Sequence, residues 1–354
     1  MHDFINIYRN PIFGILMLLC IVIIIAFADS LKAKRNRKKK RDSLNNLSKN
    51  FQNTDISQNL KSFMSYAKNP TPMLLLVAKT YSKAGNHEQA IAIYKILNEY
   101  SNNVNEKIEI LESLGESYYK AGFLERSKSI FAEILQHYPY NMAILEHYMR
   151  TCENLKQYKE ALEALNCINE IYNNQSYIAH EYNKIIQTRN YLKTMQVISD
   201  HRIDLLTQQE KLLEIYEKDK NLRNLILRHF KLYNTGLFWQ KILEIEEIYP
   251  YTDILWHFQK HEIPFDSIVQ HPQLLNIYRA KGFLGKEYSQ IECFPLEVLQ
   301  LLHLYSYTKG NLEFTYRCKI CNGTSPFYSY RCSICAEINS IELIMKPVQE
   351  INLL

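Results

Sequence analysis

Four cysteines near the C-terminus have the spacing of a metal site. Cys318 and Cys321 form one Cys-x-x-Cys turn, and Cys332 and Cys335 form a second turn fourteen residues later. Each turn follows a Tyr-Arg pair, so the two segments are near-copies. One such turn can direct two thiolates at a common centre, and two turns complete a tetrahedral set. The sequence therefore predicts that these four cysteines bind one metal ion.

Two other uses of paired cysteines fit this pattern less well. Disulfides are typical of small secreted domains, whereas the charge distribution described below predicts that this segment is cytoplasmic. A redox-active pair normally comes as a single Cys-x-x-Cys in a strand-rich unit, not as a duplicated turn. Four thiolates suit zinc, and they equally suit iron in a rubredoxin-type site. The expected cofactor is thus one ion, zinc or iron.

The segment 313–354 is expected to be a small metal-binding module. Short strands are predicted at 312–317, 326–331 and 340–345. Asn322 and Gly323 directly follow the first cysteine pair, where the chain often needs a residue that tolerates positive φ. A unit of about forty residues is too small to bury a sufficient core without a metal.

The sequence of the N-terminal segment predicts a membrane anchor. The stretch Ile12–Ala28 is seventeen residues without a charge, which is just long enough to cross a bilayer as a helix. Eight Lys or Arg residues fall within 32–41, whereas only Arg9 precedes the apolar stretch. This imbalance predicts a single-pass signal anchor over 1–31, with a periplasmic N-terminus and a cytoplasmic body.

A cleaved signal peptide is the competing interpretation, because Ala26-Phe-Ala28 resembles a signal-peptidase site. A dense basic block directly downstream opposes translocation, which favours the uncleaved anchor. The segment 32–70 is then a basic juxtamembrane connector that contacts anionic lipids through residues 32–41. The net charge is +5, and this block alone exceeds it. The rest of the chain is therefore acidic overall, and no nucleic-acid partner is expected.

The middle of the chain, 71–312, is predicted to be an all-α array of tetratricopeptide repeats. Three clear repeats extend to about residue 174, and degenerate ones follow. In each repeat small residues let two helices approach closely, and aromatic residues fill the space around them. Stacked helix pairs curve into a superhelix whose concave side suits protein partners. The defining positions are Leu74, Ala78, Tyr81, Gly85, Ala90 and Tyr94; Leu111, Gly115, Tyr118, Gly122, Ser127 and Phe131; and Leu145, Met149, Cys152, Lys156, Ala161 and Leu165.

The sequence contains no recognisable catalytic motif. It has no phosphate-binding glycine loop and no Gly-x-Ser-x-Gly nucleophile elbow. His257 and His261 stand four apart on a predicted helix, but Phe258 replaces the glutamate of a His-Glu-x-x-His site. Four protein sulfurs would leave a metal without an open position for substrate. A non-enzymatic protein is therefore expected.

The order of the parts resembles the lipopolysaccharide assembly protein B family of Gram-negative inner membranes. The likeness rests on the anchor, the basic block, the repeats and above all the terminal Cys-x2-Cys-x10-Cys-x2-Cys segment. In that family the segment is a rubredoxin-type domain that packs on the repeats, and Cys318, Cys321, Cys332 and Cys335 correspond to its metal ligands. Asn322 departs from the glycine that is usual after the second cysteine.

The resemblance implies an adaptor function. Family members work with the membrane protease FtsH to control degradation of LpxC, the deacetylase that commits carbon to lipid A. The implied partners are thus an FtsH-like protease, an LpxC-like client and other lipopolysaccharide assembly proteins; the sequence leaves open whether the chain forms a homo-oligomer. Two alternatives are a rubredoxin-like one-electron carrier docked through the repeats, and a repeat scaffold for another envelope complex.

Overall fold

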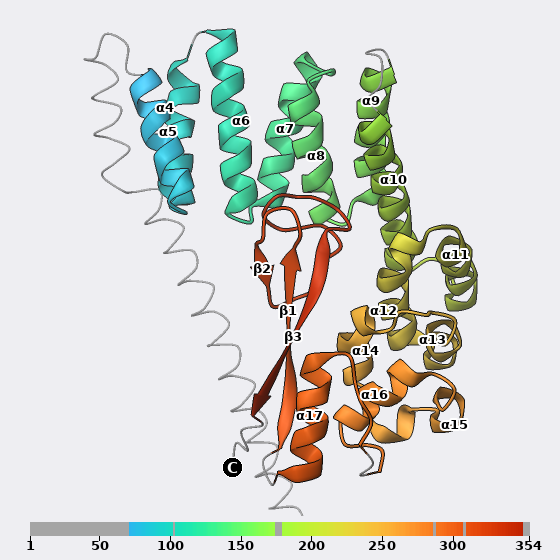
Figure 1. Ribbon diagram of the computed structural model, residues 1–354. Helices are drawn as coiled ribbons and strands as arrows, with labels where there is room; N and C mark the ends of the chain where they lie inside the picture. Colours follow the sequence, from blue (N-terminus) through green and yellow to red (C-terminus); the bar gives the residue numbers. More distant parts are fainter. Residues whose placement is uncertain (1–70, 102, 174–178, 286–287, 307–308, 350–354) are drawn as a thin grey trace, which may run out of the picture. The chain divides into compact units, whose positions relative to one another are not determined.

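The computed structural model describes residues 71–101, 103–173, 179–285, 288–306 and 309–349. The described part is mostly helical and ends in a small sheet (Figure 1). None of its helices is both long enough and apolar enough to span a bilayer. The predicted anchor and connector, residues 1–70, lie outside the described residues. The chain divides into two compact units, Met1–Ile130 and Phe131–Leu354.

The described residues of the first unit form three complete helices and the start of a fourth. Its interior is formed by small and aliphatic side chains, including the fully buried Ala78, Ala90 and Leu97. Tyr81 was expected to fill this core but is 38% exposed, because α4 packs only on α5 and α6 in the described part of this unit. The helices are α4 (Thr71–Lys83), α5 (His87–Tyr100), α6 (Val104–Lys120) and α7 (Leu124–His137), the last of which crosses into the second unit.

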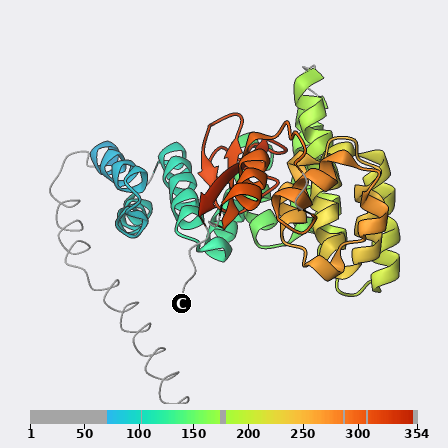
Figure 2. The ribbon, with the colours of Figure 1, turned by 60° about the horizontal axis from the view of Figure 1, so that its bottom comes forward.

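The second unit consists of helices that become shorter along the chain, followed by the sheet. Figure 2 shows the sheet lying against helices of the same unit. The α-helices are α8 (Met142–Asn154), α9 (Tyr158–Asn173), α10 (Ala179–Ser199), α11 (Leu205–Lys218), α12 (Arg223–Tyr233), α13 (Thr235–Ile242), α14 (Thr252–Trp256), α15 (Phe265–Ile268), α16 (Pro272–Ala280) and α17 (Phe294–Tyr305). Three 3-10 turns join them: η1 (Lys220–Leu222), η2 (Tyr249–Tyr251) and η3 (Lys260–Glu262).

The same left-handed cap ends four of these helices. Gly85, Gly122, Lys156 and Gly282 all have positive φ, between 61° and 83°. In each case the next residue donates a backbone hydrogen bond to the carbonyl five positions before it, as Phe123 does to Tyr118 at 2.8 Å. This is the Schellman arrangement, which satisfies the last carbonyls of a helix. The first three caps fall at one position of the three predicted repeats, so these helix-turn-helix units are confirmed locally, whereas the superhelical array stays a prediction.

The C-terminal sheet has three antiparallel strands in the order β2-β1-β3. They are β1 (Gly310–Cys318), β2 (Thr324–Ser325) and β3 (Ile341–Gln349). The strands predicted at 312–317 and 340–345 are thus confirmed and are longer than expected. The strand predicted at 326–331 is wrong, because this part of the chain enters the second cysteine turn and makes only one isolated bridge, Arg331 to Ile338.

The sheet shares its core with the helices of the second unit. Leu312, Tyr330 and Ile338 belong to the same buried apolar cluster as residues from α8 to α17. At the start of β1 the backbone comes so close to α17 that a Cβ added to Gly310 would lie 2.4 Å from a Leu299 methyl group. The metal-binding segment is therefore built onto the helices and does not form a separate globule.

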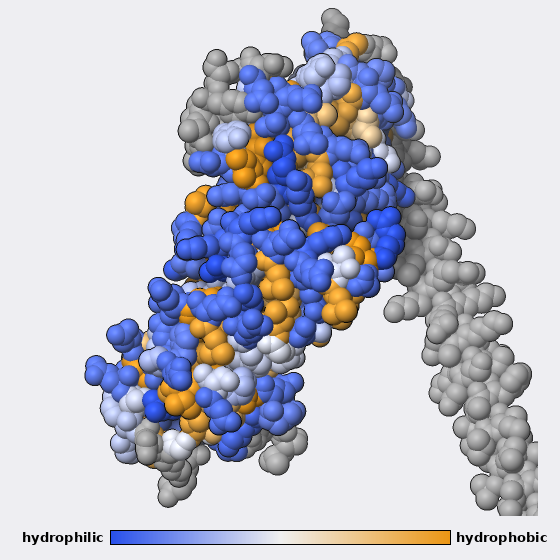
Figure 3. Space-filling view, turned by 90° about the vertical axis from the view of Figure 1, so that its right-hand side faces the viewer, coloured by the Kyte–Doolittle hydropathy of each residue, from blue (hydrophilic) through white to orange (hydrophobic). Residues whose placement is uncertain are grey.

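Exposed apolar side chains are dispersed on the face seen in Figure 3, where apolar patches alternate with hydrophilic ones. Exposed examples on the helices include Leu206, Leu232 and Phe294. Such scattered exposure is ordinary for a folded protein. It does not by itself identify a partner surface.

We expect opposite effects from two substitutions at the recurrent cap. Gly122→Ala places a Cβ in a left-handed conformation and should lower the stability of the protein by about 1 kcal/mol, whereas Lys156→Gly removes that strain and should raise it by up to about 1 kcal/mol. Urea denaturation monitored by circular dichroism measures both. Gly236→Ala, inside α13 with ordinary φ, is the control and should not destabilise. Equal effects at all three positions would contradict the assignment of a left-handed cap.

Candidate metal centre

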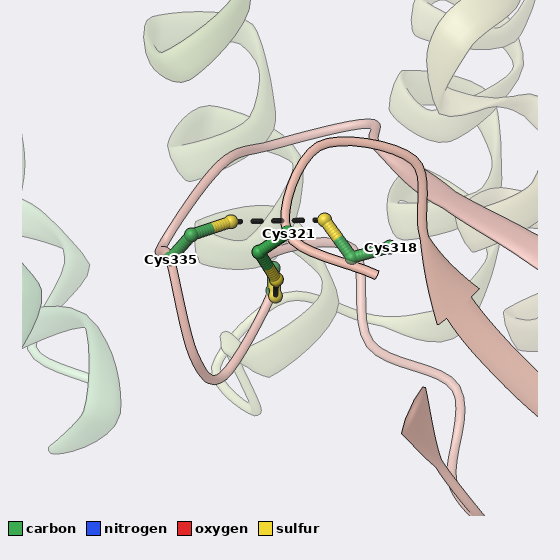
Figure 4. Close-up of side chains that lie close together, drawn as sticks. Cys318, Cys321 and Cys335 are labelled. Atoms are coloured by element: carbon green, nitrogen blue, oxygen red, sulfur yellow. Dashed lines mark hydrogen bonds between the residues drawn. The ribbon is translucent and has the colours of Figure 1, made fainter. Parts of the chain in front are cut away.

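The four predicted ligand cysteines converge on one point. Their sulfur atoms all lie within 4.8 Å of one another. Two of the separations, from Cys318 to Cys335 and from Cys321 to Cys332, are 3.6 Å, and each joins one turn to the other. Figure 4 shows the side chains of Cys318, Cys321 and Cys335 directed at a common centre. A metal–sulfur bond of about 2.3 Å gives a tetrahedron with an edge of about 3.8 Å, so these positions fit one tetrahedral ion. They are far beyond the separation in a disulfide, about 2.05 Å.

The two cysteine turns have the same backbone structure. In the first turn the amide of Asn322 donates to the Cys318 carbonyl at 2.9 Å, and in the second the amide of Ala336 donates to the Cys332 carbonyl at 3.0 Å. Asn322 and Ala336 both adopt positive φ, 57° and 60°. Of the two residues expected to tolerate this conformation, Asn322 adopts it and Gly323 does not. At the second turn it is adopted by an alanine, which requires the surrounding hydrogen bonds to hold it.

Backbone amides also face the ligand sulfurs. The amides of Ile320 and Ile334 each lie 3.4 Å from the sulfur of the first cysteine in their turn. The hydroxyl of Ser340 lies 3.3 Å from the Cys318 sulfur. Donors placed in this way stabilise thiolates and orient them toward a metal. Ser340 was not identified from the sequence, because it lies twenty-two positions from the cysteine that it contacts.

The pKa values of two thiols in the cluster indicate why the four cysteines need a bound cation. Burial alone would raise the pKa of the Cys318 thiol, but hydrogen bonds from Ser340 and from the amides of Cys321 and Ile320 lower it to about 6. The amide of Glu337 lowers the pKa of the Cys335 thiol, but burial and the neighbouring sulfurs outweigh it and raise that pKa to about 12. Four thiolates at this distance cannot all stay ionised beside one another. A bound divalent ion would compensate the charge, and binding would release protons.

The donor set favours a structural ion. Cys318 and Cys332 are buried, and Cys321 and Cys335 are half-buried. With four protein sulfurs, a tetrahedral ion has no position left for water or substrate. When bound, such an ion would join the two turns into one rigid unit. Zinc and iron both fit this site.

A buried ion pair joins the second cysteine turn to the helices. The Arg331 side chain, which directly precedes Cys332, donates from Nε to both carboxylate oxygens of Glu153 on α8 at 2.9 and 3.0 Å. Its Nη1 donates to the Ala336 carbonyl within the turn at 2.8 Å. The Tyr191 hydroxyl on α10 donates to the same carboxylate at 3.0 Å. One guanidinium thus connects the metal-binding turn to two helices.

The carboxylate of Glu153 depends on this contact. Its side chain is only 7% exposed and lies at the C-terminal end of α8, where the helix dipole disfavours negative charge. Removing the partner of a buried ion costs about 3–5 kcal/mol, because the remaining charge is left without compensation. Tyr191 adds a second contact, since its ring stacks on that of Tyr330 at 4.7 Å between centroids.

The first cysteine turn is held through a different acid. The Tyr316 hydroxyl donates to Asp253 on α14 at 2.6 Å, and Arg228 on α12 pairs with the same carboxylate oxygen. The Arg228 guanidinium also lies over the Tyr328 ring, 3.9 Å from its centroid. Asp253 is 2% exposed. Neither Glu153 nor Asp253 was singled out from the sequence, since both lie in ordinary helical segments.

The histidine pair considered from the sequence is not on one helix. His257 follows the end of α14, where its ring packs edge-on against Phe314 at 5.8 Å, whereas His261 lies in η3. Burial lowers the pKa of His257, which favours its neutral form. The expectation of a shared helix is wrong because α14 ends at Trp256. The packing interpretation of His257 is the one that the structure supports.

We expect Cys321→Ser to abolish stoichiometric metal binding and to loosen the C-terminal sheet. The substitution removes one of four thiolates, and metal binding is folding free energy for a unit of this size. Metal content by mass spectrometry and limited proteolysis of the purified chain measure the two effects. Cys167→Ser, at an exposed cysteine outside the cluster, is the matched control. Full metal occupancy in the Cys321 variant would contradict the assigned ligand set.

Arg331→Met should destabilise the protein by about 3–5 kcal/mol by leaving Glu153 buried and unpaired. The internal duplication offers a control: Arg317 occupies the same place before the first turn but pairs with Glu342 at the surface, so Arg317→Met should cost less than about 1 kcal/mol. Adding Glu153→Gln to the Arg331 variant should recover part of the loss, because it removes the unpaired charge. Urea unfolding compares the four proteins, and equal losses for both arginine variants would refute the argument.

Comparisons with protein-family models and curated proteins identify no relative of this chain. The chain matches no protein-family model, and no curated protein aligns with it significantly.

Proposed function

We propose that this protein is a non-enzymatic adaptor that regulates lipopolysaccharide synthesis at the inner membrane. The observation that carries the proposal is the closed four-cysteine site, whose two turns are fixed to the helices through Glu153 and Asp253. A metal held in this way would maintain shape and would not contact a reactant. The structure thus favours a protein whose helices present a binding surface over one that performs chemistry at the ion.

The proposed scaffold is a tetratricopeptide superhelix over 71–312 that carries a rubredoxin-type module over 313–354. Support comes from the recurrent left-handed cap, which appears at Gly85, Gly122 and Lys156 and again at Gly282. The last of these lies where the sequence suggests a degenerate repeat. Stacked helix pairs of this kind offer an extended surface for segments of other proteins.

The proposed place of action is the cytoplasmic face of the inner membrane. The signal anchor predicted over 1–31 and the positive charges over 32–41 support it. Anchoring confines the adaptor to the plane in which a membrane protease also lies. Confinement raises the effective concentration of the two for each other without any new contact.

The proposed client is LpxC and the proposed protease is FtsH. This assignment rests on the resemblance in the order of parts to the lipopolysaccharide assembly protein B family. In this role the adaptor binds the deacetylase and promotes its degradation, which limits lipid A synthesis.

Depletion of the protein in its own host should raise the steady-state level of LpxC several-fold and increase lipopolysaccharide relative to phospholipid. Immunoblotting after translation is stopped measures the half-life of LpxC. The full chain should restore it. A chain lacking residues 1–30 should fail to do so even when its metal content is normal, because it is no longer confined to the membrane. An unchanged LpxC half-life on depletion would refute the proposed pathway.

A one-electron carrier is the second candidate, and the amide–sulfur contacts at Cys318 and Cys332 favour it. Such contacts, together with burial, set the potential of iron–thiolate sites. Metal analysis and visible absorption of protein purified without air separate the two functions. A site that holds only zinc excludes electron transfer, whereas a reversible iron couple would support it.

A further inference from the structure

One edge of the C-terminal sheet is an open row of backbone donors and acceptors. In the antiparallel pair of β1 and β3, Cys318 lies opposite Ile341. Just beyond this end of the ladder, Lys319 and Ser340 form a hydrogen-bonded pair, since the Lys319 amide donates to the Ser340 carbonyl at 2.8 Å. Hydrogen-bonded and non-hydrogen-bonded pairs alternate along an antiparallel ladder. The even-numbered residues of β3 therefore pair with β1, and the odd-numbered residues direct their N–H and C=O groups to the outer edge.

Two observations support this alternation. The Cys318 amide donates away from β3, to the Gly323 carbonyl at 2.9 Å on the β2 side. Pro347, which has no N–H, falls on an odd position of β3. A proline is tolerated in an edge strand where its missing donor faces outward. Within the described residues, no backbone partner is seen for the outward groups of Ile341, Leu343 and Met345.

A cleft lies beside this open edge and extends beneath the sheet, where Tyr316 and Tyr328 line it. Its volume is about 330 Å³. Residues from both faces of β3 line it. Leu343 lies on the face toward the helices, opposite Tyr316, whereas Glu342 lies on the other face, where it pairs with Arg317. This lining places the cleft beside the edge of β3 and not only beneath one face of the sheet. The opposite wall is formed by Asn224 and Arg228 of α12 and by Glu247, Tyr249 and Pro250 around η2.

The fixed charges of the cleft balance one another. Arg228 is paired with Asp253, and Glu342 is paired with Arg317 at 2.6 Å. The other two charged residues in the lining, Lys319 and Glu247, have opposite signs. A strongly charged ligand would gain no net attraction here. The remaining lining is largely apolar and aromatic, which complements an uncharged segment with apolar side chains.

We infer that this cleft binds an extended, uncharged segment of a partner polypeptide, which adds to the outer edge of β3 as a fourth strand. The outward groups of Ile341, Leu343 and Met345 recur every second residue, about 6.8 Å apart, and an extended backbone presents complementary groups at the same interval. Strand addition obtains its affinity from these main-chain bonds and its selectivity from pockets for alternate side chains. Pro347 limits the pairing to the first part of the strand, which also protects the edge from pairing along its full length.

Amide hydrogen exchange on the full chain in detergent micelles tests whether the edge is open. The amides of Ile341, Leu343 and Met345 should exchange at least roughly 10-fold faster than those of Glu342, Ile344 and Lys346, because only the second set is bonded to β1. Equal protection of the two sets would show that the odd positions already have partners. That result would overturn the inference.

Binding is tested with seven-residue peptides selected from a random display library on the full chain. The selected peptides should be uncharged with alternating apolar residues, and they should slow exchange at Ile341, Leu343 and Met345. Methylating their backbone nitrogens at alternate positions should weaken binding at least roughly 10-fold, since each hydrogen bond contributes about 1 kcal/mol and an unpaired group adds a penalty. A selection that yields no such peptide, or peptides indifferent to methylation, would refute strand addition.

Two variants at one position separate backbone from side-chain recognition. Leu343→Pro removes an outward N–H but no bond to β1, as Pro347 already does in the native strand, whereas Leu343→Ala keeps the N–H and shortens the side chain. Binding should fall at least roughly 10-fold more in the proline variant. An equal loss would indicate an apolar pocket and overturn the inference. If the proline variant does not bind metal, its weaker peptide binding is not informative. The comparison of methylated with unmethylated peptides on the native chain then tests strand addition.

The biological identity of the segment rests on the proposed adaptor function, which predicts that it belongs to a client or to the protease. Different experimental results would refute the proposed pathway and the proposed peptide site. If depletion leaves LpxC unchanged while the peptides bind as expected, the pathway is wrong and the site stands. If depletion stabilises LpxC but the edge binds no peptide, the pathway stands and the client is held elsewhere.

Discussion

The repulsion among four sulfurs is the constraint on which the C-terminal part of the second unit depends. Thiolates within 4.8 Å of one another stay together only if a cation compensates their charge. Sulfur atoms of the two turns approach each other to 3.6 Å at two places, so the ion would join the two halves of the module. Once the halves are joined, Tyr316 and Arg331 are held where they meet Asp253 and Glu153. The buried charges of the helices are thus satisfied from outside the helices, and the metal site and the helices stabilise each other.

The duplicated cysteine turns have the same backbone but different surroundings. The residues that precede them, Tyr-Arg in both copies, make different contacts in each. Tyr316 donates to a buried carboxylate, whereas Tyr330 stacks on an aromatic ring. Arg317 pairs at the surface within the sheet, whereas Arg331 reaches a helix. Identity of sequence therefore fixes the local turn, and the position of each copy in the fold decides what its side chains do.

How far the sequence could predict this protein follows from the same distinction. The ligand cysteines, the positive φ of Asn322 and the first three helix pairs are local features, because spacing and turn chemistry determine them within a few residues. The pairs that fix the module to the helices could not be predicted, since Arg331 and Glu153 are 178 residues apart and Tyr316 and Asp253 are 63 apart. The strand expected at 326–331 failed because only its end pairs with another segment, with Tyr330 accepting from the Asn339 amide and Arg331 forming one isolated bridge to Ile338. The rubredoxin-type and tetratricopeptide assignments remain expectations drawn from pattern.

The short helix α14 carries Asp253, the carboxylate to which the Tyr316 hydroxyl of β1 donates. Asp253 lies in its first turn, where the helix dipole favours a carboxylate. Cationic side chains donate to carbonyls at its end, Lys231 to Ile254 at 2.6 Å and Lys281 to Trp256. Lys281 also donates to the carbonyl of Phe258, just beyond the helix, at 2.7 Å. Burial lowers the pKa of both lysines, so their ammonium groups are held at a desolvation cost that the carbonyl contacts offset. A five-residue helix has little stability of its own, and it is therefore the flanking cations and the Tyr316 hydroxyl that keep Asp253 aligned. The sheet, with its open β3 edge, is consequently oriented by charges fixed in the helices and by the metal-binding turns together.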